Sequence, residues 1–149
     1  MDIRSATRVG LGIIGTSLSL VATAGAQAGP YLSDLPKLYP AAYTLWTQSL
    51  PYALGPLPDW LAGLKGVVTP IRDVSVGRVS MKFGTTCMPH DCGGNIAGVL
   101  FSPQGSRIVA LVRLIGKSPV SNVLIVGSMT NAEISCVQRL IDNDQADSC

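Results

Sequence analysis

The sequence is poor in the residue types from which most active sites are built, because it contains a single histidine, His90, and a single glutamate, Glu133. It also has no recognisable nucleophile motif, no phosphate-binding GxGxxG pattern, no internal repeat and no low-complexity block. General acid–base and nucleophilic catalysis need several reactive groups held close together. We therefore expect a protein that is not an enzyme and that uses no cofactor.

Strong net charge and long apolar runs are also absent. The formal net charge is only +2 at pH 7, which argues against the basic footprint of a nucleic-acid-binding protein. After residue 28, no apolar run approaches the roughly 20 residues that a membrane-spanning helix needs. Neither a nucleic acid nor, after export, a membrane is the expected partner.

The amino-terminal segment has the three parts of a secretory signal peptide. Two arginines supply the basic start, residues 11–24 form an uncharged apolar stretch, and Ala26-Gln27-Ala28 supplies the small residues of a cleavage site. The apolar stretch is shorter than a typical membrane span, and the alternatives to cleavage at this site are an uncleaved anchor or cleavage after Ala24 or Ala26. We expect cleavage near Ala28, removal of residues 1–28, and export of residues 29–149 to the periplasm as a single domain.

Helical periodicity is found at both ends of the expected domain. After Pro40, which suits a first helical turn, an aromatic and aliphatic stripe recurs every three or four residues, at Tyr39, Tyr43, Trp46 and Leu50. A short helix is expected from Pro58, with Trp60 as its core anchor. A last helix is expected after Thr130, because Thr130 and Glu133 have the spacing of a capping box. Its apolar face is formed by Ile134, Val137 and Ile141.

The middle of the chain has the alternation and turn signals of β-strands. Val79, Met81 and Phe83 alternate with polar residues, and three further β-rich runs follow at 95–102, 107–115 and 123–129, with an edge strand possible within 68–76. Helices, then strands, then a helix predict an α+β fold. We expect an antiparallel sheet of about four to five strands, flanked by helices at both ends, with a disulfide-closed protruding loop.

All four cysteines lie in the part of the chain that we expect to be exported: Cys87, Cys92, Cys136 and Cys149. An even number in an exported chain indicates two disulfides, and four cysteines allow three connectivities. The simplest pairing is local, Cys87 with Cys92 and Cys136 with Cys149. The second bridge would then be structural and would tie the acidic end of the chain to the last helix.

The segment CMPHDC, residues 87–92, is where residues able to carry chemistry cluster. It lies between one strand expected to end near Phe83 and another expected to begin near Asn95. A disulfide across it would remove most of the freedom of the four residues between the cysteines, and Pro89 would fix the backbone just before His90. Such a preorganised tip lowers the entropic cost of binding.

Three interpretations fit these six residues. The first is a stapled hairpin with a solvated, inert histidine. The second is an exported metal-binding protein that uses Cys87, Met88, His90 and Cys92, since such ligands suit Cu(I) or zinc. Against it, these residues are crowded into one turn, and exported thiols tend to oxidise. The third is a rigid loop that presents an imidazole to the cleft of a partner.

The segment resembles the marker of the inhibitor of vertebrate lysozyme (Ivy) family, a disulfide-closed loop with the sequence Cys-Lys-Pro-His-Asp-Cys. Five of the six positions match: Cys87, Pro89, His90, Asp91 and Cys92. The order of two amino-terminal helices and then a sheet with a protruding loop is also similar, and covers most of residues 30–149. The resemblance implies a periplasmic protein, commonly a homodimer, that inhibits C-type lysozyme by inserting this loop into the active-site cleft.

The resemblance also implies roles for the loop residues, with Met88, Pro89, His90 and Asp91 as partner-binding residues. Lysozyme works with two carboxyl groups in a cleft, and an imidazole from His90 fits between them. Asp91 either contacts the cleft, orients His90, or is a turn residue that bonds its own backbone. Met88 replaces the family's lysine, so we expect a changed potency or a changed preference among lysozymes.

Overall fold

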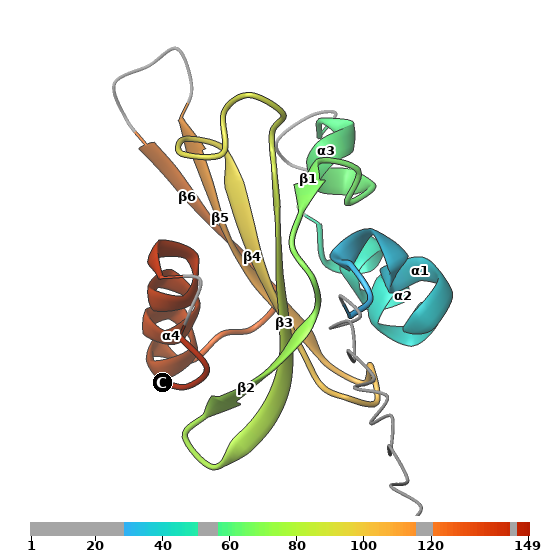
Figure 1. Ribbon diagram of the computed structural model, residues 1–149, viewed down its shortest axis with the longest axis vertical. Coiled ribbons are helices and arrows are strands. Elements are labelled where there is room, and N and C mark those ends of the chain that lie inside the picture. Colours follow the sequence, from blue (N-terminus) through green and yellow to red (C-terminus); the bar gives the residue numbers. More distant parts are fainter. Residues whose placement is uncertain (1–28, 51–56, 116–120, 144–145) are drawn as a thin grey trace, which may run out of the picture.

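The computed structural model describes residues 29–50, 57–115, 121–143 and 146–149, which form helices packed on an antiparallel sheet (Figure 1). The expected signal peptide lies outside these residues. The helical elements are η1 (Leu32–Asp34), α1 (Leu35–Leu38), α2 (Pro40–Ser49), α3 (Asp59–Ala62) and α4 (Asn131–Asp142). The strands are β1 (Val67–Val68), β2 (Arg72–Val76), β3 (Val79–Cys87), β4 (Ile96–Phe101), β5 (Ile108–Ile115) and β6 (Ser121–Val126). Among the described helices, none combines the length and the apolar character needed to cross a membrane.

Neighbouring strands run antiparallel throughout the sheet, in the order β1-β3-β4-β5-β6, and β2 also pairs with β3. β1 lies opposite the carboxyl end of β3, at Thr86 and Cys87, whereas β2 lies opposite its first half. From β2 to β6 the strands follow the order of the chain. The predicted α+β class and antiparallel sheet are confirmed, with six strands rather than four or five.

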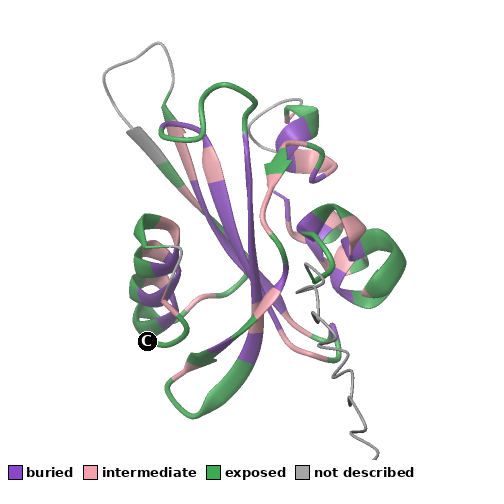
Figure 2. Cartoon of the chain, viewed as in Figure 1, coloured by how far each residue is buried: buried purple, intermediate pink, exposed green. Residues whose placement is uncertain are grey.

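Different helices cover the two faces of the sheet (Figure 1). On one face, α1, α2 and α3 share a core cluster with Ala97, Val99 and Phe101 of β4, and on the other face α4 packs against a cluster that includes Leu100. Because successive side chains of a strand point to opposite faces, β4 is buried on both sides. Figure 2 shows the centre of the sheet buried, while the turn between β2 and β3 and the outer strand β6 are more exposed.

The aromatic stripe predicted for the first long helix is confirmed in α2. Trp46 is fully buried, and Tyr39 and Tyr43 pack against the same cluster. The indole N–H of Trp46 donates a hydrogen bond of 3.2 Å to the carbonyl of Ala62 in α3. Trp60 is buried in that short helix, as expected. The hydrogen bond from the indole N–H of Trp46 and the burial of its ring thus hold α2 and α3 together on one face of the sheet.

The capping box predicted at the start of the last helix is confirmed in α4. Thr130 Oγ1 accepts a hydrogen bond of 3.2 Å from the N–H of Glu133, and Glu133 Oε2 accepts one of 2.8 Å from the N–H of Thr130. Further along α4, Val137 and Ile141 lie over Gly98 of β4, where an added Cβ would come within 2.8 Å of both side chains. The missing side chain at Gly98 therefore lets α4 pack closely on the sheet.

The first strand of the expected pair continues past its predicted end and stops at Cys87. Thr85 and Thr86 are buried within it although they are polar. Their hydroxyls have partners inside the fold, since Thr86 donates a bond of 3.0 Å to the carbonyl of Trp60. The prediction that the loop begins directly after Phe83 is therefore wrong, and the projecting loop is shorter than expected.

The last strand also differs from its predicted span, because β6 ends at Val126 rather than near residue 129. Gly127 follows with a φ of +76°, a left-handed conformation that leaves the strand. The chain then turns toward Thr130, which is the N-cap of α4. The glycine thus separates the final strand from the final helix.

Candidate functional site

Both disulfides of the chain have the local connectivity that was the simplest of the three. Cys87 is bonded to Cys92, with a Cα–Cα distance of 4.9 Å, and Cys136 to Cys149, with a Cα–Cα distance of 5.3 Å. All four cysteines are therefore bonded. The first bridge ties the buried end of β3 to the exposed loop that leads to β4, at the end of the sheet opposite the β2–β3 turn (Figure 1).

The tip of this loop is a β-turn formed by Met88, Pro89, His90 and Asp91. The N–H of Asp91 donates a hydrogen bond of 3.0 Å to the carbonyl of Met88, which closes the turn. His90 has a φ of +67°. Proline at the second position and a positive φ at the third are the features of a type II turn, in which the third residue is usually glycine or asparagine. A histidine thus occupies a turn position whose positive φ favours glycine or asparagine, so the backbone at His90 is strained.

Asp91 is exposed, but its carboxylate is hydrogen-bonded within the loop. Its Oδ1 accepts a hydrogen bond of 3.3 Å from the N–H of Gly94, and its Oδ2 accepts one of 2.6 Å from the side-chain amide of Asn95. The backbone N–H of Asn95 donates to the carbonyl of Asp91 at 2.9 Å. These contacts match the turn-residue role among the three considered for Asp91. The carboxylate supports the loop from within.

Asn95 joins the two ends of the loop and is itself buried. Its carbonyl accepts a hydrogen bond of 2.9 Å from the N–H of Met88. The sequence pattern predicts Asn95 only as the start of a strand, although an amide four residues after Asp91 is a signal for such a contact. Asp91 and Asn95 together form an internal brace that acts alongside the disulfide.

The exposed part of the loop is its tip. Met88 is 43% exposed, and Pro89 and His90 are also exposed. Asp91 is exposed as well, so all four residues predicted to bind a partner are exposed on one turn, although the carboxylate of Asp91 is hydrogen-bonded within the loop. The tip presents the two ring nitrogens of His90 and the apolar side chains of Met88 and Pro89. It carries no lysine, because Met88 stands at that position of the motif.

The two glycines after Cys92 have different surroundings. A Cβ added at Gly94 would lie 2.9 Å from Asp91 Oδ1 and 3.1 Å from Ile115 Cδ1, whereas one added at Gly93 would meet nothing within 4 Å. Gly94 is required by close packing of the loop against the end of β5. Gly93 faces open space.

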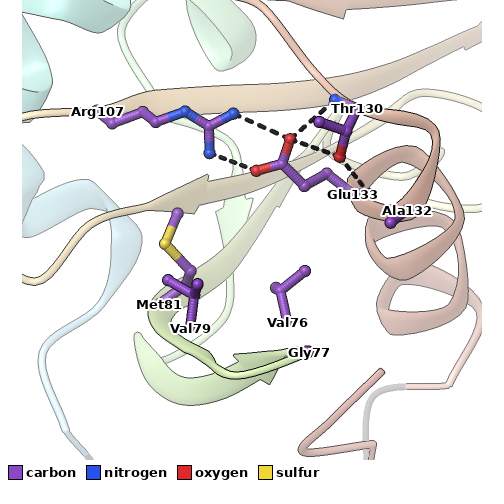
Figure 3. Close-up of a pocket in the computed structure, with 8 residues that line it drawn as sticks. All are labelled: Val76, Gly77, Val79, Met81, Arg107, Thr130, Ala132 and Glu133. Atoms are coloured by element: carbon purple, nitrogen blue, oxygen red, sulfur yellow. Dashed lines mark hydrogen bonds and ion pairs between the residues drawn. The ribbon is translucent and has the colours of Figure 1, made fainter.

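A second polar cluster lies away from the loop, at the start of α4 (Figure 3). Arg107 forms a two-pronged ion pair with Glu133, one prong of which measures 2.9 Å, and also donates to the carbonyl of Ser128 at 2.9 Å. The guanidinium of Arg107, helped by the backbone and hydroxyl of Thr130, lowers the pKa of Glu133 to about 2. The one glutamate of the chain is therefore a fixed negative charge, unsuited to proton transfer near neutral pH.

A shallow groove of about 410 Å³ adjoins this ion pair and is lined mainly by small and aliphatic residues, including Val76, Val79 and Met81. Figure 3 shows these side chains on the β2–β3 hairpin, facing the Arg107–Glu133 pair. The sequence does not predict the pairing of Arg107 with Glu133, because nothing in the local pattern indicates a partner so far along the chain.

The described residues contain no group of three or more histidine, cysteine, aspartate or glutamate side chains that could hold a metal ion. In the loop, Cys87 and Cys92 are bonded to each other. A metal site that uses both would need them as thiolates. The metal-binding interpretation thus loses two of its four ligands while the disulfide is intact.

Comparison with known proteins gives little guidance. No known family profile matches the chain. Over 63 residues the chain is 30% identical to an uncharacterized protein of Yersinia pestis, and the match covers 42% of this chain and 41% of that protein. The chain thus matches less than half the length of this relative. A match of this extent does not assign the chain to a family.

Proposed function

We propose that this protein is an inhibitor of C-type lysozyme that inserts the loop between Cys87 and Cys92 into the active-site cleft of the enzyme. The observation that carries the proposal is the placement of His90 at the tip of a braced, disulfide-closed turn, in a left-handed conformation. A residue kept in a strained conformation at an exposed tip is a common mark of a functional position. The choice of C-type lysozyme as the target rests on the resemblance of the CMPHDC segment to the marker of the Ivy family.

The chemistry of an imidazole suits the active site of lysozyme. In retaining glycosidases the two carboxyl groups are about 5 to 5.5 Å apart. One of them is kept protonated as the general acid and the other is ionised. An imidazole has a nitrogen on each side of its ring, so one ring can form a hydrogen bond to each of two neighbouring carboxyl groups. His90 would then occupy the place where the reacting sugar and the catalytic groups meet.

The support of the tip favours tight binding. The disulfide, Pro89 and the Asp91–Asn95 brace hold the turn before any partner arrives. A loop that is already ordered loses less conformational entropy when it binds. His90, Pro89 and Met88 therefore act as the contacting residues, and Asp91 acts mainly by keeping His90 in place.

A lysozyme assay tests the proposal. Oxidised protein covering residues 29–149 is mixed with a C-type lysozyme, and lysis of a cell-wall suspension is followed as the molar ratio is raised. Inhibition should be complete near an equimolar ratio. Full lysis at equimolar and tenfold excess would contradict the proposal, whereas inhibition only at large excess would point to the loss of a contact at Met88.

Export to the periplasm is part of the same proposal. Lysozyme acts on the cell wall, so an inhibitor has to be on the outer side of the inner membrane. Expression of the full chain in a Gram-negative host, followed by fractionation and amino-terminal sequencing, should give a periplasmic protein that begins near Gly29. A full-length product in the cytoplasm would contradict this part of the proposal.

A further inference from the structure

Three aliphatic side chains lie exposed on the sheet beside the loop. Ile115 of β5 is 50% exposed, and Val123 and Ile125 of β6 are 57% and 45% exposed. Val123 lies opposite Arg113 in the register of the two strands, and Arg113 is two residues before Ile115. Alternate residues of a strand share a face, so the three side chains form one aliphatic strip. Large aliphatic side chains grouped on a surface mark interaction sites more often than isolated ones do.

The aliphatic strip is attached to the base of the loop. The N–H of Ile115 donates a hydrogen bond of 3.2 Å to the carbonyl of Gly94. The side chain of Ile115 lies directly against Gly94, close enough that an added Cβ would be 3.1 Å from its Cδ1. Figure 1 shows the loop between β3 and β4 beside the upper ends of β5 and β6. A protein that receives the loop is therefore brought next to the strip.

The loop tip is too small to form a stable interface by itself. A specific complex of ordinary size buries about 800 Å² and about 20 to 30 residues on each partner. The turn at the tip presents only four exposed residues, Met88, Pro89, His90 and Asp91. An inhibitor that acts at an equimolar ratio needs further contact area, and that area has to adjoin the loop.

The charges around the aliphatic strip fit an apolar contact. Arg113, which lies on the same face, is paired with Asp142 of α4 at 2.9 Å. Covering the strip therefore removes aliphatic surface from water without isolating an unpaired arginine. A second copy of this chain seated on the strip would lie against the base of the loop and would obstruct its entry into a cleft.

From these observations we infer that Ile115, Val123 and Ile125 form a second contact with the same target, packing against an apolar part of the rim of its cleft. This inference rests on the proposed function, because the loop brings the target to the strip. The loop then supplies the contact with the catalytic groups, and the strip supplies apolar area that slows dissociation.

The test is a double variant, Val123→Thr with Ile125→Thr, in which both side chains stay β-branched and suited to a strand. The matched control is Val79→Thr, an equally exposed valine (59%) at the start of β3, far from the loop. Association and dissociation rates with C-type lysozyme are measured by surface plasmon resonance. The double variant should bind about tenfold more weakly, which corresponds to about 1.4 kcal/mol, mostly through faster dissociation. The control should bind like the parent.

The outcomes separate this inference from the proposed function. If the parent protein does not bind lysozyme, the proposed function is wrong, and the inference about the strip is overturned with it. If the parent binds and the double variant binds equally well, the loop is sufficient and the strip is not a contact. Light scattering on the parent and the double variant gives a further check. A parent dimer that the double variant converts to a monomer would show that the strip is covered by a second copy, which also overturns the inference.

Discussion

At the scale of single residues, His90 has a backbone conformation that is less favourable for histidine than for glycine or asparagine. A non-glycine residue with positive φ carries a strain of roughly 1 kcal/mol, although histidine tolerates this region better than most residues. Glycine would relieve the strain and asparagine would reduce it. A histidine at this position is what the proposed contact with a partner would require.

Replacement of His90 should affect inhibition far more than folding. His90→Ala is expected to weaken inhibition by about 30-fold or more, as for a hot-spot residue whose truncation costs about 2 kcal/mol. His90→Gly should lose inhibition similarly but unfold at a higher temperature than His90→Ala, because glycine accepts the φ of +67° without strain. Inhibition titrations and thermal denaturation of both variants check this. Full inhibition by either one would show that the imidazole is not the central contact.

The pair Gly93 and Gly94 tests the packing of the loop base. Gly94→Ala places a methyl group against Asp91 Oδ1 and Ile115, so it should disturb the brace and weaken inhibition about tenfold or more. Gly93→Ala meets open space and serves as the control, with inhibition within about twofold of the parent. Backbone chemical shifts of residues 88–95 should move in the first variant only. Equal inhibition by both variants would contradict the packing argument.

At the scale of the elements, the two disulfides have separate tasks. The Cys87–Cys92 bridge holds the tip, whereas the Cys136–Cys149 bridge holds the carboxyl-terminal tail, which pairs with Ser75 of β2 through two backbone hydrogen bonds of 3.0 Å. We therefore expect the first bridge to matter for the proposed binding and the second for the stability of the folded domain.

Removing either bridge should lower stability, but only removal of the Cys87–Cys92 bridge should lower affinity. Cys87→Ser with Cys92→Ser should leave the domain folded, at a cost of roughly 2 kcal/mol, and should lower affinity for lysozyme because the tip must be ordered on binding. Cys136→Ser with Cys149→Ser should cost about 3 kcal/mol of stability and leave affinity unchanged. Urea denaturation and binding titrations measure the two effects. If the first variant bound as tightly as the parent, preorganisation of the tip would have no role.

The elements differ in how far the sequence predicted them. The stripe of α2 and the capping box of α4 were predictable because their signals are local, as was the pairing of cysteines that are close in sequence. The burial of Thr86 was not, since its hydroxyl is satisfied by Trp60 from a distant helix. Within the site, the turn and its histidine were predictable from CMPHDC. The bonds of Asp91 to Gly94 and Asn95 are also local, and the amide at Asn95 is a signal for them. The contact between Gly94 and Ile115 depends on tertiary packing that the local pattern does not encode.

At the scale of the whole molecule, the ion pair between Arg107 and Glu133 links the residue just before β5 to the first turn of α4. Glu133 is 8% exposed, and the side chain of Arg107 is 42% exposed. The pKa of Glu133 is lowered to about 2 in the folded protein, from the ordinary 4.5. A lowered folded pKa means that this stabilisation is fully present above pH 4.5 and is lost as the pH falls toward 2.

Acid should therefore destabilise the parent more than a variant that lacks this carboxylate. Between pH 5 and pH 2 we expect Glu133→Gln to lose about 2 kcal/mol less of its free energy of unfolding than the parent, a value reduced for the exposure of Arg107. Glutamine keeps the capping-box geometry, so the helix start remains intact in the variant. Urea denaturation at pH 5, 3.5 and 2 measures the difference. Parallel pH profiles would show that the ion pair does not contribute to acid stability.

The order of the strands also bears on how the chain folds. Each strand from β2 to β6 pairs with its neighbour in sequence, so the sheet can grow one hairpin at a time and close only short loops. The disulfides join cysteines 5 and 13 positions apart, so each also closes within a local segment. A reduced and unfolded chain can therefore find its native bridges without bringing remote cysteines together. Oxidative refolding should need little help from a disulfide isomerase, and the slowest contacts should be those between Trp46 and the much later strands of its cluster.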